Sequence, residues 1–230
     1  MGRGIFVTGA GTEIGKTLVA AALAHQLLSR GEVVRVLKPV ISGFDPTRPE
    51  ISDTGLLLTA AGRAVTDAAI AHASPWRFAQ PIAPNMAARR AGAPIDLDQV
   101  VAHCRAGLEG AGVLVIEGVG GVMAPITDQA TGLDWMAALG LPAVLVGGSY
   151  LGAISHTLTA AAALMERAIP VAGVVISQSA DQPVPLAETA AAVAALLPRI
   201  PVIEVPRMAQ RPRPWEAVPD LTALVGPPKD

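Results

Sequence analysis

A glycine-rich stretch near the start of the chain constrains its fold more than any other feature. Residues 9–17 read Gly-Ala-Gly-Thr-Glu-Ile-Gly-Lys-Thr, follow an apolar run at 5–7 and open a helix-like run at 18–28. A glycine-rich turn between a buried strand and a helix, ending in Gly-Lys-Thr, is typical of a phosphate-binding P-loop. This layout predicts that Lys16 reaches the outer phosphates of a nucleotide and that the Thr17 hydroxyl binds Mg²⁺.

The loop departs from the usual motif by one residue. Five residues separate Gly9 from Gly15, where the motif has four. Either Ala10 takes the place of the first glycine, or the loop is one residue longer. A glycine-rich turn with a chance Lys-Thr is the alternative, but the strand, loop and helix context favours a phosphate site.

Strand-like and helix-like runs alternate along most of the chain. This alternation predicts an α/β fold: a three-layer, doubly wound, mostly parallel sheet of the P-loop NTPase type, with helices on both faces. We expect strands at 3–8, 33–38, 113–117, 142–146, 171–176 and 202–205, and helices at 16–30, 52–61, 86–90, 96–108, 154–167 and 186–197. We expect residues 1–230 to form one domain, with a proline-rich tail from about 208 that is loop and partly ordered at best.

Composition narrows the class of protein. A chain of 230 residues with 51% hydrophobic residues can build a large core. A net charge of −2 without a basic block argues against nucleic acid or an anionic membrane as the main partner. Cys104 is the single cysteine, so a disulfide framework is excluded. We expect no signal peptide, because the first strand starts almost at Met1, and a cytoplasmic location.

Residues 135–165 contain no charged side chain. A run of this length can indicate a membrane span. Here Pro142, Gly147, Gly148 and further polar or small residues interrupt it. We therefore interpret it as the end of a helix, a buried parallel strand, a loop and a second helix.

Polar residues follow three of the expected strands or lie close to them. Lys38 ends the second strand and would point into the same crevice as Lys16, because ligands of such sheets bind beyond the carboxyl ends of the strands. Two ammonium groups suit a reaction that passes negative charge between oxygens. Glu117 after four apolar residues has the layout of a Walker-B carboxylate, and Asp53 on a helix capped by Ser52 is a second candidate metal ligand.

Each of these residues also has a structural interpretation. Lys38 alone could be a solvated lysine at a strand end. Asp53 could complement the dipole of its helix. Glu117 could be an acid at the mouth of a loop, but Gly118, Gly120 and Gly121 follow it and permit close backbone approach to a ligand.

Other chemistries find no support in the sequence. The four histidines show no metal-ligand spacing with one another or with Cys104, and no Ser-His-Asp arrangement is visible. The tryptophans are isolated and form no stacking platform.

Taken together, these residues resemble the dethiobiotin synthetase family. The resemblance runs from about Ile5 to Met208. It rests on a combination of motifs, among which the extended P-loop is the family's own form: Thr8-Gly9 with residues 12–17, Lys38-Pro39-Val40, Ser42-Gly43, Asp53, residues 81–84, residues 117–121, and Leu151-Gly152 with His156.

The resemblance implies a reaction. The enzymes of this family use 7,8-diaminononanoate, CO₂ (or bicarbonate) and Mg·ATP. One amine takes up CO₂ as a carbamate, ATP phosphorylates the carbamate, and the second amine closes the ureido ring with loss of phosphate. The family is homodimeric, with the diamine at the subunit interface.

The resemblance also assigns roles to residues of this chain. Thr12, Lys16 and Lys38 would surround the carbamate and the γ-phosphate, and Thr17, Asp53 and Glu117 would hold Mg²⁺. The implied nucleotide-binding residues are Glu13, Ile14, Gly15, Lys16, Thr17, Leu18, Asp53, Glu117, Gly118, Val119, Gly120, Ser177, Gln178, Pro206, Arg207 and Met208. The implied substrate-binding residues are Ser42, Leu151, Gly152 and Ser155.

The chain departs from the family at two positions. Ser177-Gln178 follow Ile176 where the family usually has Asn to read adenine, and Ser155 occupies a position that is often Asn. These departures leave the base selectivity and part of the carboxylate contact open.

Three other classes of protein fit the sequence less well. A partitioning or scaffold ATPase would have a second lysine in the loop, at the position of Gly11. An amide-forming ligase of cobalamin synthesis would need a glutaminase domain. A GTPase would show an Asn-Lys-x-Asp signature, which is missing from the sequence.

Overall fold

A six-stranded parallel sheet forms the centre of the molecule. The computed structural model describes residues 3–208 and 211–226. The strands lie in the order β2-β5-β1-β6-β7-β8, and every neighbouring pair is parallel. Their bounds are β1 Arg3–Gly9, β2 Val34–Leu37, β5 Val113–Glu117, β6 Ala143–Gly147, β7 Val171–Ser177 and β8 Val202–Val205.

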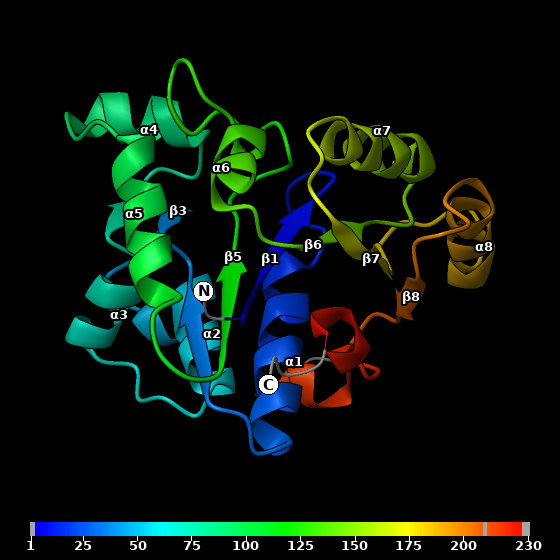
Figure 1. Cartoon of the computed structure of the whole chain (residues 1–230), viewed down its shortest axis with the longest axis horizontal. Helices are drawn as coiled ribbons and strands as arrows, with labels where there is room; N and C mark the ends of the chain where they lie inside the picture. The colour runs from blue at the N-terminus through cyan, green and yellow to red at the C-terminus, as the bar shows by residue number, and fades with distance from the viewer. Residues whose placement is uncertain (1–2, 209–210, 227–230) are drawn as a thin grey trace.

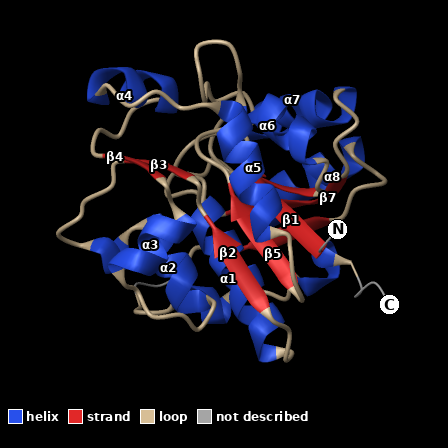
Figure 2. Ribbon diagram, turned by 60° about the vertical axis from the view of Figure 1, so that its left-hand side comes forward, coloured by secondary structure: helices blue, strands red, loops and turns tan. Residues whose placement is uncertain are grey.

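Helices cover both faces of this sheet, which gives the three layers that the sequence predicts (Figures 1 and 2). Helix α1 packs on one face, and α5 to α8 lie on the other. The helices are α1 Lys16–Ser29, α2 Asp53–Ala60, α3 Asp67–Ala73, α4 Pro84–Ala91, α5 Leu97–Gly107, α6 Gly132–Leu139, α7 Ala153–Glu166 and α8 Leu186–Leu196. Within the described ranges, no helix combines the length and the apolar character that a bilayer crossing needs.

The composition of the central elements explains their packing. All residues of β5 and β6 are buried, and both are rich in Val, Leu and Ile, as strands covered on two faces require. Helix α1 is enclosed by the sheet, by α2 and by the 3-10 helix η2 (Pro214–Ala217), and its Ala20, Ala21, Ala22 and Ala24 are each at most 1% exposed. Because alanine adds little bulk, α1 lies close to these neighbours.

The strand order positions the ligand crevice. The chain leaves β1 through α1 toward β2 on one side, while β6 lies on the other side of β1. In open α/β sheets such a reversal opens a crevice beyond the carboxyl ends of the strands. The loop at residues 9–17 begins at this point, between β1 and α1.

The predicted strands and long helices are confirmed with bounds shifted by a residue or two. The region between β2 and α5 contains more structure than we predicted. Helix α3 begins after Thr66, whose side chain accepts a hydrogen bond from Ala69 N. Two short strands, β3 Val40–Ser42 and β4 Trp76–Phe78, pair in parallel as a separate ribbon, and a 3-10 helix, η1, covers Pro49–Ile51.

The C-terminal segment is also more ordered than we expected. Residues 211–226 form two 3-10 helices, η2 Pro214–Ala217 and η3 Thr222–Val225, and bury Trp215 and Leu221. The expectation of a plain loop is therefore wrong for 211–226, while 209–210 and 227–230 lie outside the described residues. The Gln26 amide on α1 holds the segment: its nitrogen donates to Val218 O and Pro219 O, and its oxygen accepts from Leu221 N at 2.9 Å.

Candidate active site

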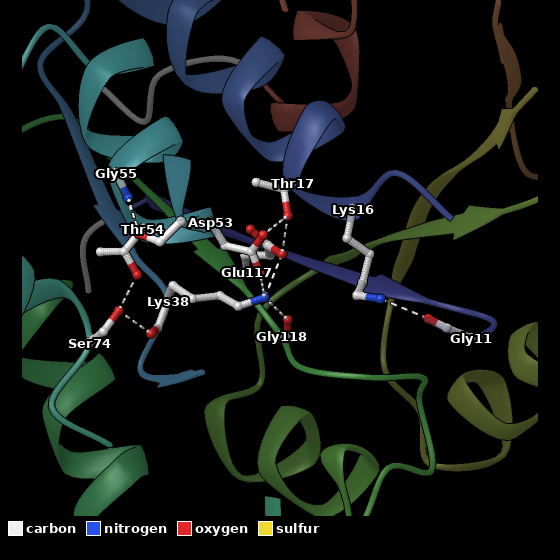
Figure 3. A network of polar contacts seen from close by, with 11 residues as sticks. Gly11, Lys16, Thr17, Lys38, Asp53, Thr54, Gly55, Ser74, Glu117 and Gly118 are labelled. Atoms are coloured by element: carbon white, nitrogen blue, oxygen red, sulfur yellow. Dashed lines mark hydrogen bonds and ion pairs between the residues drawn. The ribbon is translucent and has the colours of Figure 1, made fainter. Parts of the chain in front are cut away.

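The loop at residues 9–17 curls tightly in front of α1. Gly15 is the N-cap of α1 with φ +90°, and Glu13 has φ +56°, which is uncommon for a residue with a side chain. The buried Lys16 side chain turns back and donates to Gly11 O at 2.7 Å (Figure 3). The ammonium group therefore lies at the mouth of its own loop, where an anion bound to the helix N-terminus would meet it.

A second ammonium group lies at the centre of an ion network. Lys38 Nζ is 2.5 Å from Glu117 Oε1 and 3.1 Å from Asp53 Oδ2, and it donates to Gly118 O at 2.9 Å (Figure 3). Lys38 follows β2, Glu117 ends β5 and Asp53 begins α2. Lys38 is 3% exposed and Glu117 1%. Removal of one partner from such a buried pair leaves the other charge uncompensated.

Two carboxylates and a hydroxyl converge beside this network. Thr17 Oγ1 is 2.9 Å from Asp53 Oδ1 and 2.9 Å from Glu117 Oε1. Glu117 Oε2 is buried and finds no hydrogen-bond partner in the part of the chain that the structure describes. Among the described residues no group of three His, Cys, Asp or Glu converges as a metal site. The set nevertheless fits Mg²⁺, which takes one or two carboxylates and completes its shell with water and phosphate oxygens.

The network shifts the pKa values of its members. Burial lowers the pKa of Lys16 to about 8, and the charge of Lys38 adds to this effect. Burial would also lower the pKa of Lys38, but the Glu117 and Asp53 carboxylates outweigh it and raise the pKa. Burial raises the pKa of Glu117, while that of Asp53 is held below its usual value by Lys38 against the effect of burial. Lys38 is therefore a fixed positive charge at neutral pH.

The backbone of Lys38 is fixed as firmly as its side chain. Ser74 Oγ donates to Lys38 O at 2.7 Å and shares a 2.5 Å hydrogen bond with Thr54 Oγ1, while Lys38 N donates to Ala73 O. Thr54 and Ser74 are fully buried. Helices α2 and α3 therefore hold the end of β2 in position, and the direction of the Lys38 side chain follows from this support.

Two cavities flank the loop at residues 9–17. The cavity on the β2 and β5 side, which we call the substrate-side cavity, has a volume of about 590 Å³. The cavity on the β7 and β8 side, which we call the base-side cavity, has a volume of about 610 Å³. Thr12, Glu13 and Gly15 line both, so the loop forms the wall between them.

Most of the predicted site residues line one of these cavities. The substrate-side cavity contains Lys16, Thr17, Lys38, Ser42, Asp53, Glu117, Val119 and Gly120. The base-side cavity contains Ile14, Leu18, Ser177, Gln178, Pro206, Arg207 and Met208. Gly118 contributes its carbonyl to Lys38.

Besides Gly118, three predicted residues line neither cavity. Leu151, Gly152 and Ser155 are exposed at the start of α7 and line neither cavity of their own chain. Conversely, the predicted site residues do not include Tyr150, Pro214 or the loop 179–181, all of which line the base-side cavity. Tyr150 closely follows β6, and its position past a strand end is the one signal that could have singled it out. Nothing in the sequence around Pro214 indicates such a position.

This fold and this loop define a P-loop NTPase-type protein. Two solved structures share the fold. The MinC:MinD cell division protein complex of Aquifex aeolicus has a TM-score of 0.52 and 12% sequence identity, and the match covers 89% of this chain and 81% of that chain. A ParA family ATPase of Chlorobium tepidum has a TM-score of 0.52 and 13% sequence identity, and the match covers 90% of this chain and 85% of that chain. At such identity the likeness shows the fold alone. It therefore does not favour the partitioning-ATPase alternative.

Sequence comparison is more specific. A family model described as an AAA domain matches residues 3–213. The ATP-dependent dethiobiotin synthetase BioD of Methylobacterium nodulans is 50% identical over 197 residues, 83% of this chain and 87% of the relative. That of Acidiphilium cryptum is 49% identical over 186 residues, 80% and 83% of the two chains. The chain belongs to the ATP-dependent dethiobiotin synthetase family, a family of biotin biosynthesis, and is an ATP-dependent ligase.

Proposed function

We propose that this ligase makes dethiobiotin from 7,8-diaminononanoate, CO₂ and Mg·ATP. The observation that supports this most directly is the position of Lys38, held between Glu117 and Asp53 in a cavity that also contains Lys16. Two ammonium groups, two carboxylates and a threonine hydroxyl in one cavity suit phosphoryl transfer between oxygens, which needs positioning and charge stabilisation.

The proposed reaction has three steps. One substrate amine attacks CO₂ and loses a proton, which gives a carbamate. A carbamate oxygen attacks the γ-phosphorus and ADP leaves, which gives a carbamic-phosphoric anhydride. The second amine attacks the carbonyl carbon and loses a proton, and inorganic phosphate leaves as the ureido ring closes. No nucleophilic side chain is required, because the substrate amines form both new C–N bonds.

The residues of the substrate-side cavity bind and orient the reactants. Lys38, Lys16 and Thr12 surround the carbamate and the transferred phosphoryl group and stabilise the charge that develops on their oxygens. Ser42 offers a polar contact to the substrate, because its Oγ is buried and no residue at 3–208 or 211–226 hydrogen-bonds to it. Thr17, Asp53 and Glu117 would hold Mg²⁺, which neutralises negative charge on the phosphates when bound.

The base-side cavity would receive the adenosine part of ATP. The wall that the loop forms between the cavities would then lie along the phosphate chain. Ser177, Gln178 and the segment Pro206–Met208 would contact the base, with Gln178 fixed by the hydrogen bond that its side chain accepts from Arg207 N at 3.0 Å.

We further propose that the protein acts as a cytoplasmic homodimer. The exposed start of α7, with Leu151 86% exposed, would face the substrate of the partner subunit. There Leu151, Gly152 and Ser155 would bind the substrate carboxylate, since a helix N-terminus attracts anions without an arginine.

A phosphate-release assay tests this proposal. The purified protein is supplied with Mg·ATP, bicarbonate and 7,8-diaminononanoate, and each component is omitted in turn. Release of phosphate should require all of them, and one dethiobiotin should form for each phosphate. Hydrolysis of ATP at the same rate without the diamine would contradict the proposal and favour a nucleotide-driven switch.

A further inference from the structure

The turn between β6 and α7 is tied to the loop that follows β7. Ser149 N donates to Ser179 Oγ at 3.0 Å, and Ser179 N donates to Ser149 Oγ at 2.9 Å. Ser149 Oγ also donates to Gln182 Oε1 at 3.1 Å. Ser149 is buried. This reciprocal pair makes the two loops one unit, because displacement of either would break both hydrogen bonds and leave buried Ser149 without its partners.

Tyr150 projects from this unit toward two different places. Its half-buried ring lines the base-side cavity beside Ser177 and Gln178. Its hydroxyl shares a hydrogen bond of 2.8 Å with Nδ1 of His156, which lies on the first turns of α7. The ring thus touches the space for the nucleotide base, while the hydroxyl touches the helix.

The backbone of Tyr150 also begins that helix. Tyr150 O accepts from Ala153 N at 2.9 Å, and Gly152 in the left-handed region is the N-cap of α7. The ring lies against Gly148, where an added Cβ would fall 2.7 Å from the Tyr150 ring and 2.9 Å from Ser179 Oγ, so only a glycine fits beside it. A shift of Tyr150 would disturb both of its hydrogen bonds to the first turns of α7, the one from Ala153 N and the one with His156.

We propose that Tyr150 is a positioning residue that links occupancy of the base-side cavity to the first turn of α7, with Ser149 and Ser179 holding it in place. The inference rests on the proposed placement of the nucleotide base in that cavity. Through Tyr150, binding of the nucleotide would then be coupled to the start of α7, which would bind the substrate carboxylate.

The sequence provides a direct spectroscopic reporter, because Tyr150 is the only tyrosine of the chain. Protein labelled with 3-fluorotyrosine should give one fluorine resonance. Addition of ADP should shift this resonance with a midpoint equal to the calorimetric Kd for ADP. A resonance that stays unchanged at saturating ADP would overturn the inference.

The second reporter is His156 at the start of α7. Its ring resonance is one of four histidine signals and is assigned by its loss in His156→Gln. ADP should shift this resonance in the wild type. In Tyr150→Phe, which keeps the ring and removes the hydroxyl, the ADP-induced shift should fall to less than about one fifth, while the Kd for ADP stays within about threefold.

Ser179→Ala tests the support of Tyr150, and Thr159→Ala is the matched control. Thr159 is exposed on α7, one turn beyond His156. Ser179→Ala should reduce the His156 response as Tyr150→Phe does, and Thr159→Ala should leave it unchanged. A full His156 response in both Tyr150→Phe and Ser179→Ala would show that the helix moves without this contact and would overturn the inference.

The experiment separates this inference from the proposed function. The Tyr150 and His156 resonances are measured with ADP alone, so they test the link through Tyr150 independently of the identity of the second substrate. A protein that shows the Tyr150 and His156 shifts but no diamine-dependent phosphate release would contradict the proposed reaction and support the link. Diamine-dependent phosphate release without the Tyr150 and His156 shifts would support the proposed reaction and overturn the link through Tyr150.

Discussion

The two cavities on either side of the P-loop have similar volumes but are built in different ways. The substrate-side cavity is organised by buried charges on the ends of β2 and β5, which pair at 2.5 Å and are supported by two further layers of hydrogen bonds. The base-side cavity is organised by loops after β7 and β8, with uncharged side chains of intermediate burial such as Ser177 and Gln178 and an exposed Arg207.

This difference indicates a division of work. Buried, paired charges are costly to disturb and are held in one geometry, as a reaction that moves charge between oxygens requires. On the base side, the neutral hydrogen bond from Arg207 N to the Gln178 side chain can break at modest cost, so the segment Pro206–Met208 can adjust to a ligand. Substitutions should therefore affect turnover on the substrate side and nucleotide affinity on the base side.

The largest effect is expected from Lys38→Ala. Loss of a group that stabilises the charge of the transition state should reduce kcat by about 10²–10³-fold. The matched control is Arg90→Ala on the exposed face of α4, for which kcat should stay within about twofold. Circular dichroism should show that the fold survives. If folded Lys38→Ala kept a kcat within severalfold of the wild type, the buried network would have a structural role only. The proposed difference between the two cavities would then be wrong.

A smaller effect is expected from Glu117→Gln. The substitution keeps the size of the side chain and removes one of the two carboxylates beside Thr17. The Mg²⁺ concentration that gives half-maximal phosphate release should rise by at least about tenfold, since loss of even an outer-shell partner of a metal has such an effect. Glu109→Gln, at an exposed position after α5, is the control. An unchanged Mg²⁺ titration would remove Glu117 from the metal site.

On the base side, Gln178→Ala should act on binding alone. It deletes the acceptor of the Arg207 N–H, a neutral hydrogen bond with a net contribution of about 1 kcal/mol. The KM for ATP should rise roughly fivefold while kcat stays within about twofold. Exposed Gln129→Ala provides the comparison. If kcat fell as far as in Lys38→Ala, the proposed division between the cavities would be wrong.

The smallest catalytic effect is expected from Gln26→Ala. Gln26 holds the C-terminal segment that brings Pro214 to the base-side cavity. The free energy of unfolding should fall by about 1–3 kcal/mol, because three backbone groups lose their partner. The KM for ATP should change less than about threefold, and the KM for the diamine not at all. Gln99→Ala on α5 is the control for the loss of an amide side chain at the surface. A selective rise in the KM for the diamine in Gln26→Ala would contradict the assignment of the C-terminal segment to the base side.

The sequence predicts the substrate side better than the base side for a physical reason. A charged residue that directly follows four buried apolar residues, as Glu117 does, is unusual, and Lys38 follows the apolar end of its strand, so both signal a site without any knowledge of the contacts. The sequence does not predict which of these charges pair. Lys38 contacts Glu117 because β2 lies next to β5, and no local sequence pattern determines the order of strands in a parallel sheet.

The elements that the sequence did not predict are short or depend on distant contacts. Strands β3 and β4 have three residues each, too few for a periodicity, and they pair across a long intervening segment. The C-terminal segment looked like loop because of its prolines, but Pro214 begins η2, where a missing N–H has no cost, and buried Trp215 anchors the turn. Tyr150 is not among the predicted site residues, because its position past a strand end is a weak signal by itself.

The alanines of α1 have a consequence for how sequences of this kind can vary. Ala20, Ala21, Ala22 and Ala24 line neither cavity, yet each is almost fully buried, and their small size lets α1 fit between the sheet and the covering elements α2 and η2. A larger side chain there would displace the helix, at about 1–3 kcal/mol, and would move Lys16 and Thr17 at its start. Phosphate recognition thus depends partly on four buried methyl groups that touch no ligand, and substitutions at these positions would appear as weakened catalysis.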